Sequence, residues 1–289
     1  MKKIDDIIAI VGPTASGKSD LALKLAKENN GVILSVDSLS VYKEIDIASA
    51  KPTKEELAEV KHFGVDVLYP DESFDVIRFL DEFKVAKSYA KQESKKLIIV
   101  GGSSFYLKVL VDGISKMPKI SSDIKRRVAN CLVDIDRAYE EMLNIDREYM
   151  SKIAKGDRYR LERAYQIFYA TSLKPSQYFK ENRAKAVEPD LKIYEIKVDR
   201  TTLRERVEKR TKKMLELGLI DEVAYLEHRY TREPNSMKSI GIKEVLDYFD
   251  GKLSKIELEQ KIVINTMRLA KRQVTFNKSQ LNTLCADFL

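Results

Sequence analysis

The sequence predicts an α/β fold in which helices flank a parallel β-sheet that carries a phosphate-binding loop (P-loop), together with an all-helical insertion. Three observations favour this fold class. Short apolar runs alternate with segments of helical periodicity, which is typical of parallel sheets covered by helices on both faces. A glycine-rich motif joins the first apolar run to the first helical segment, and a long central segment has no convincing strand.

The expected strands are four short apolar runs at residues 7–11, 32–36, 97–100 and 193–198. Apolar residues recur at helical spacing after the first run, over residues 19–26, and after the third, over residues 105–111. From the fourth run to the C-terminus we expect helices. This alternation predicts that all four strands lie parallel in one sheet.

The central segment, residues 115–188, shows helical patterns rich in Arg, Lys, Tyr and Glu. Proline residues at or near its edges are plausible breaks between domains. The predicted core domain therefore comprises residues 1–114 and 189–289, and residues 115–188 form the helical insertion.

The 289 residues carry a net charge of +7, and the positive charges are clustered. Every charged residue from 261 to 286 is basic, and seven bases accompany two Glu between residues 200 and 213. Such clusters attract polyanions. No apolar run approaches the ~20 residues of a membrane span, and the N-terminus lacks the pattern of a signal peptide. We therefore expect a cytoplasmic protein without a membrane partner.

The glycine-rich motif matches the phosphate-binding loop G-x-x-x-x-G-K-[ST], and it consists of Gly12, Pro13, Thr14, Ala15, Ser16, Gly17, Lys18 and Ser19. It lies between a predicted strand and a predicted helix, as the motif requires. The glycines let backbone N–H groups point at phosphate oxygens, Lys18 neutralises phosphate charge, and Ser19 can hold Mg²⁺. We expect this loop to bind a diphosphate or polyphosphate with Mg²⁺ as the cofactor.

The loop alone is typical of nucleotide-binding proteins, among them ATP-binding hydrolases and kinases. Two features argue against an ATPase or GTPase. The run at residues 97–100 ends in Gly101–Gly102 rather than in an acidic residue, and no N-K-x-D sequence follows. Group transfer is therefore the favoured chemistry.

Asp37 follows the second predicted strand and should emerge at the same sheet edge as the phosphate loop. The stretch from Asp37 to Pro52, DSLSVYKEIDIASAKP, resembles the tRNA dimethylallyltransferase signature D-S-x-Q-V-Y-x-x-x-D-I-x-T-A-K-P. Blocks at residues 100–107, 157–164, 239–244 and 266–276 resemble further motifs of that family in the same order. Among the positions that depart from the pattern, Ser40, Ser103, Ser104, Tyr159 and Met267 replace Gln, Thr, Gly, Gln and Arg.

The resemblance implies transfer of a dimethylallyl group from dimethylallyl diphosphate to the N6 amine of the adenosine 3′-adjacent to the anticodon of a tRNA. It implies that Asp37 is the general base, that Ser103 hydrogen-bonds between diphosphate and base, and that Arg206 binds the diphosphate. From the residues alone, Asp37 could instead support Mg²⁺ indirectly or cap a helix. Arg206 could belong to a solvated helix face.

The expected partners are the anticodon stem-loop of tRNA and dimethylallyl diphosphate; no protein partner is expected, and we expect a monomer. Residues from both domains are expected to contact the tRNA, namely Asp37, Ser38, Leu39, Ser40, Ser103, Lys125, Tyr159, Arg160, Leu161, Glu162, Arg163, Ile240, Gly241, Lys243, Arg268, Lys271 and Arg272. Arg268, Lys271 and Arg272 share a helical face that could lie along phosphates. For any one of the basic residues, a solvated surface position is the alternative.

Three other functions stay open. An adenylate prenyltransferase acting on free nucleotides would share the phosphate loop and the aspartate, but would leave the insertion without a purpose. A P-loop small-molecule kinase would leave the stretch from Asp37 to Pro52 unexplained. A non-catalytic RNA-binding module would need neither Lys18 nor Asp37.

Overall fold

The structure is a computed structural model that describes residues 4–288. The chain divides into two compact units. The core unit comprises Met1–Val111 and Glu188–Leu289, and the insertion unit comprises Asp112–Val187. No helix within residues 4–288 is long and apolar enough to cross a membrane.

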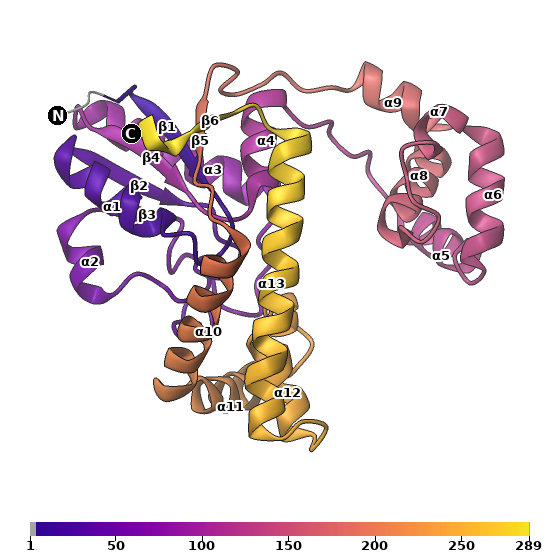
Figure 1. Ribbon diagram of the computed structural model, residues 1–289. Helices are drawn as coiled ribbons and strands as arrows, with labels where there is room; N and C mark the ends of the chain where they lie inside the picture. The colour runs from indigo at the N-terminus through magenta and orange to yellow at the C-terminus, as the bar shows by residue number, and fades with distance from the viewer. Residues whose placement is uncertain (1–3, 289) are drawn as a thin grey trace. The chain divides into compact units, whose positions relative to one another are not determined.

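The core unit contains a parallel sheet whose strand order is β3-β2-β4-β1-β5-β6 (Figure 1). Its strands are β1 (Ile7–Val11), β2 (Gly31–Ser35), β3 (His62–Phe63), β4 (Lys96–Val100), β5 (Lys192–Glu195) and β6 (Thr283–Cys285). The predicted fold class is confirmed. Because β1, β4 and β2 are parallel neighbours, the loops that follow them meet at one edge of the sheet.

Helices cover both faces of the sheet (Figure 1). The helices that precede the insertion unit in the chain are α1 (Lys18–Glu28), α2 (Lys54–Glu59), α3 (Val76–Gln92) and α4 (Ser104–Asp112). Alternate side chains of each strand point to opposite faces, so Val11 belongs to the apolar cluster that contains Phe83 of α3, while Ile10 belongs to the cluster that contains Leu25 of α1. All four are almost fully buried, and each such burial contributes about 1.5–3 kcal/mol.

The prediction of helices from β5 to the C-terminus was wrong at one point. Residues 283–285 form β6, which pairs in parallel with β5 at the sheet edge. β3 was not predicted either. Both strands have three residues or fewer, which is too short to produce the alternating pattern that reveals a strand in a sequence.

A second helical layer follows β5 and consists of α10 (Arg200–Glu216), α11 (Leu219–Tyr230), η1 (Asn235–Lys238), α12 (Ile242–Phe249) and α13 (Lys255–Gln280). The short helix η2 (Ala286–Phe288) follows β6. Met214, Leu226, Val245 and Leu258 form a separate apolar core between these helices. Ile45, from the segment after β2, is fully buried in this core. The helical layer therefore fixes the segment that leads away from Asp37.

The insertion unit is helical throughout, with α5 (Ser122–Cys131), α6 (Ile135–Ile145), α7 (Arg147–Met150), α8 (Arg158–Thr171) and α9 (Pro175–Glu181). Its own core includes Met142, Leu161 and Tyr165. Most of these helices begin at a Ser or Asp side chain that accepts a hydrogen bond from a first-turn amide, such as Asp157 at α8.

Candidate active site

The phosphate loop has the shape that its sequence predicts. Gly17, at the start of α1, has a φ of 88°, in the left-handed region that favours glycine. The hydroxyl of Ser16 is buried and finds no hydrogen-bond partner in the described part of the chain. A buried polar atom of this kind is costly unless a ligand or water satisfies it, as expected of a loop built around an anion.

Two cations meet beside this loop. Burial lowers the pKa of Lys18 from 10.5 to about 8, with Asp37 opposing the shift and Arg210 adding to it. Burial also lowers the pKa of Arg210, again against the attraction of Asp37. Desolvation penalises each charge, and one carboxylate cannot neutralise both cations. The site therefore favours an added anion.

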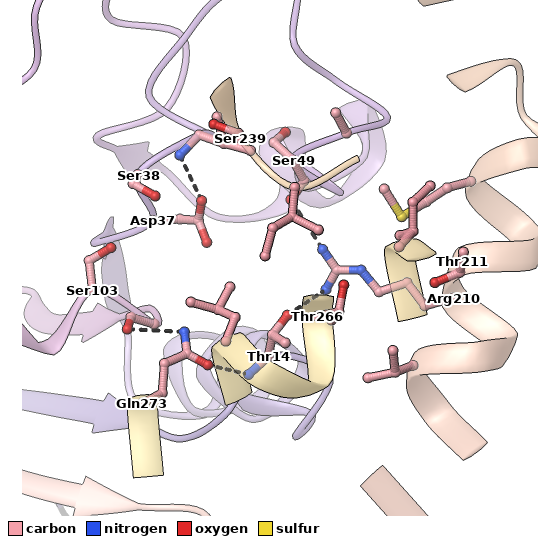
Figure 2. Close-up of a pocket in the computed structure, with 18 of the residues that line it drawn as sticks. Thr14, Asp37, Ser38, Ser49, Ser103, Arg210, Thr211, Ser239, Thr266 and Gln273 are labelled. Atoms are coloured by element: carbon pink, nitrogen blue, oxygen red, sulfur yellow. Dashed lines mark hydrogen bonds between the residues drawn. The ribbon is translucent and has the colours of Figure 1, made fainter. Parts of the chain in front are cut away.

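Asp37 lies just past β2, and its carboxylate shapes the following turn. Its Oδ1 accepts hydrogen bonds from the backbone N–H groups of Leu39 at 2.8 Å and Ser40 at 3.3 Å. In Figure 2, Asp37, Ser38 and Ser103 lie on one side of a cavity and Arg210 lies across from them. The structure thus brings the predicted aspartate and serine to the same sheet edge as the phosphate loop.

Two cavities flank the phosphate loop. The first, of about 320 Å³, is lined by Asp37, Ser103, Ile240 and Arg272 among others. The second, of about 570 Å³, is lined by residues 15–20, by Lys51 and by Arg206. Lys18 and Arg210 line both cavities. The two partly buried cations therefore lie between a compartment that contains the carboxylate and one that is lined by the phosphate loop.

Arg210 and Gln273 are site residues that the sequence analysis did not single out. Arg210 Nη1 donates to Thr14 Oγ1 at 3.5 Å, and its Nη2 donates to the Ser49 carbonyl at 3.4 Å. Gln273 accepts from the Thr14 N–H at 2.9 Å and donates to the Gly102 carbonyl at 3.1 Å (Figure 2). The sequence contains a feature that points to each of them. Arg210 is one helical turn after Arg206, and Gln273 belongs to the last family-like block.

Arg206 and Ser19 lie in the second cavity. Arg206 is exposed, and its Nη1 donates to the Ser16 carbonyl at 3.2 Å. Ser19 is exposed at the first turn of α1. Both predicted residues therefore face the compartment of the phosphate loop.

The basic face predicted on α13 is divided. Arg272 lines the first cavity, whereas Arg268 and Lys271 line a separate groove of about 560 Å³ between α13 and α10. The three residues therefore do not border a single cavity.

Other residues predicted to contact tRNA lie in different settings. Ser38 and Lys243 are exposed, Leu39 is partly buried, and Gly241 is buried where α12 begins. Ser40 is buried, and its hydroxyl is 2.9 Å from that of Ser35, so its side chain is engaged within the protein.

In the insertion unit Lys125, Tyr159 and Arg160 are exposed, and the Arg163 guanidinium lies 5.2 Å from the centre of the Tyr159 ring. Glu162 accepts a hydrogen bond from Gln166. Leu161 is fully buried in the core of this unit. A tRNA contact through the Leu161 side chain is therefore excluded, because the apolar face of α8 uses it for packing.

The depressed pKa of Lys18 predicts a pH dependence for anion binding. The ammonium is charged below about pH 8 and loses its proton as pH rises through that value, so binding of inorganic pyrophosphate weakens. Calorimetry without Mg²⁺ should show a loss of about tenfold between pH 7 and 9, the size expected for one linked proton. Lys18→Arg stays charged and corrects for the titration of pyrophosphate itself; the same pH profile in both proteins would contradict the prediction.

A phosphate loop, two partly buried cations and a carboxylate at one sheet edge define a P-loop protein suited to group transfer from a phosphorylated donor. The family model described as IPP transferase matches residues 40–280. The chain belongs to this family, in agreement with the resemblance of its sequence blocks.

Relatives and solved structures agree with this assignment. The chain is 54% identical to the tRNA dimethylallyltransferase of Nautilia profundicola over 275 residues, 95% of this chain and 93% of the relative. The tRNA isopentenylpyrophosphate transferase of Bacillus halodurans has a TM-score of 0.69 at 29% identity, with 96% and 88% of the two chains covered. A eukaryotic dimethylallyltransferase acting on tRNA has a TM-score of 0.82 at 27% identity, with 97% and 73% covered.

Proposed function

We propose that this protein transfers a dimethylallyl group from dimethylallyl diphosphate to the N6 amine of the adenosine 3′-adjacent to the anticodon in tRNA, releasing diphosphate. The observation that carries the proposal is the pair of cavities that share Lys18 and Arg210, with Asp37 in one of them. Family membership supplies the reaction class. We also assign the protein to the cytoplasm, in keeping with the proposed tRNA substrate.

The diphosphate is placed at the phosphate loop formed by Gly12, Pro13, Thr14, Ala15, Ser16, Gly17, Lys18 and Ser19, on backbone N–H groups of this loop. Pro13 has no N–H group, and the N–H of Thr14 is bound to Gln273, so neither of these two residues is counted among the donors. Lys18, Arg206 and Arg210 supply positive charge around it. An allylic diphosphate ionises when charge on its leaving group is stabilised, so these donors lower the barrier. Planar guanidinium groups also suit two phosphate oxygens at once.

The donor set also suits Mg²⁺. The ion takes oxygen ligands and commonly uses one or two protein groups together with phosphates and water. No cluster of three or more His, Cys, Asp or Glu side chains that could hold a metal occurs in residues 4–288. Ser19 is exposed, and its hydroxyl would hold Mg²⁺ against the diphosphate. The ion would neutralise charge on the leaving group.

The acceptor adenine is placed in the first cavity. Its exocyclic amine is weakly nucleophilic because the ring withdraws its lone pair, and it gains reactivity as its proton leaves. Asp37 takes that proton, while its Oδ1 keeps the turn to Leu39 and Ser40 in place. Ser103, which also lines this cavity, would hydrogen-bond between base and diphosphate.

Reaching the amine requires the adenine to leave its stack in the anticodon loop, which costs a few kcal/mol. Contacts to tRNA phosphates offset this cost. Arg272 and Lys243 in the core unit are candidates for such contacts, as are Lys125 and Tyr159 in the insertion unit. Ile240, which lines the first cavity, is a candidate for an apolar contact to the tRNA. We assign the insertion unit to binding of the anticodon stem-loop, and a monomer suffices for this function.

A transfer assay tests the proposal directly. Purified protein with Mg²⁺ and radiolabelled dimethylallyl diphosphate should label unmodified tRNA and leave AMP unlabelled. Label on AMP would instead indicate an adenylate prenyltransferase. If well-folded protein labels neither acceptor, the prenyltransferase proposal fails, and phosphate transfer from ATP becomes the reaction to examine.

A further inference from the structure

Glu222 of α11 binds three successive backbone amides of a distant segment. Its Oε2 accepts hydrogen bonds from Asp46 N at 2.8 Å and Ile47 N at 2.7 Å, and its Oε1 accepts one from Ala48 N at 2.9 Å. Hydrogen bonds to a charged acceptor are stronger than neutral ones. This carboxylate therefore fixes the path of the segment, which we call the site loop (residues 45–52).

Lys51 holds the same loop from within. Its ammonium donates to the Tyr42 carbonyl at 2.9 Å, to Asp46 Oδ1 at 2.5 Å and to Asp66 Oδ1 at 2.6 Å, and its side chain is only 5% exposed. An ammonium has three donors, so all three are used. Although Lys51 lines the second cavity, it is bound to the loop and has no donor left for a diphosphate.

The site loop contacts both cavities. Ala48 and Ser49 line the first, and Ala50, Lys51 and Pro52 line the second. The Ser49 hydroxyl donates to the Ile45 carbonyl at 2.6 Å, which tightens the loop.

The carbonyl of Ser49 accepts the hydrogen bond from Arg210 Nη2 at 3.4 Å. The loop therefore helps to aim the guanidinium that faces Lys18 and Asp37.

We infer that Glu222 is a positioning residue for prenyl transfer: by holding the amides of residues 46–48 it places the Ser49 carbonyl, which in turn orients Arg210 toward the diphosphate. The inference rests on the proposed function for its kinetic consequence, although the local structure can be tested without it. Lys51 completes the support from the opposite end of the loop.

Glu222→Gln keeps the size of the side chain but removes its charge and replaces one acceptor with a donor. We expect faster amide hydrogen exchange at residues 46–48 and a fall of about 10- to 100-fold in kcat/KM for dimethylallyl diphosphate, the range that small misplacements produce. The KM for tRNA should change less than twofold. Glu222→Asp, which keeps the charge, should recover part of the activity and serves as the second variant if Glu222→Gln does not fold.

Asp221→Asn is the matched control, because Asp221 is exposed in the same turn of α11 and its loss changes net charge equally. It should behave like the parent protein. If Glu222 acts through Arg210, the double variant that combines Glu222→Gln with Arg210→Lys should show a smaller fold-loss in kcat/KM than the product of the fold-losses of the two single variants. Unchanged exchange at residues 46–48, or kinetics of Glu222→Gln equal to those of Asp221→Asn, would overturn the inference. A parent protein that transfers no prenyl group to tRNA would overturn the proposed function instead, and the exchange measurement would still decide the role of Glu222.

Discussion

Asp37→Asn is expected to lower kcat for prenyl transfer by about 10²- to 10⁴-fold, the contribution typical of a positioned general base. An asparagine amide has the same shape as the carboxylate and still offers one oxygen to the N–H groups of Leu39 and Ser40. It cannot take the proton of the adenine amine. The turn should therefore persist while the chemistry is lost.

Single-turnover rates with labelled dimethylallyl diphosphate and separate tRNA binding measurements would distinguish these effects. Asp37→Ala, which also removes the acceptor of the turn, is the comparison. It should lose stability in addition to activity, and a loss confined to Asp37→Ala would mean that the side chain acts only through the turn. Near-normal rates in both variants would rule out Asp37 as the base.

Arg210→Lys is expected to lower kcat/KM for dimethylallyl diphosphate by about 10²- to 10³-fold, comparable to removal of one preorganised donor from a developing anion. Lysine keeps the positive charge but lacks the planar guanidinium whose two nitrogens donate to Thr14 and Ser49 at the same time. Arg206→Lys should cost less, because Arg206 is exposed and its charge is screened by solvent.

Lys209→Ala is the control, because Lys209 is an exposed base on the same helix. Calorimetry should show the same order for pyrophosphate affinity as for kcat/KM, with a larger fall in Arg210→Lys than in Arg206→Lys. If Arg206→Lys proves more damaging than Arg210→Lys, the leaving group is held mainly from the exposed side of the second cavity, and the assignment of Arg210 is wrong.

Local sequence signals predicted the central architecture well. The strands next to the phosphate loop are apolar runs with clear turn signals, so β1, β2 and β4 lie within one residue of their expected positions. The phosphate loop could be assigned because its chemistry is confined to eight consecutive residues. Asp37 could be placed near it because parallel strands end at the same edge.

Other features depend on contacts between distant residues, and these have no local pattern. The spacing of one helical turn from Arg206 puts Arg210 on the same side of α10, but it does not show that the guanidinium turns into a cavity. The packing of α10 against α13 decides this. Glu222 looks like an ordinary acid in the first turn of a helix, yet it binds amides about 175 residues earlier in the chain. Leu161 falls within a family-like block, but the apolar face of its helix buries it.

The hydrogen bond between Gln273 and Thr14 joins residues 259 positions apart. During synthesis the phosphate loop emerges from the ribosome long before the helix that supplies Gln273. Contacts of such high sequence separation close slowly, because the entropy of a long loop is lost before they form. The anion site therefore belongs to the late stages of folding, and the nascent chain carries an incomplete phosphate loop until α13 has been made.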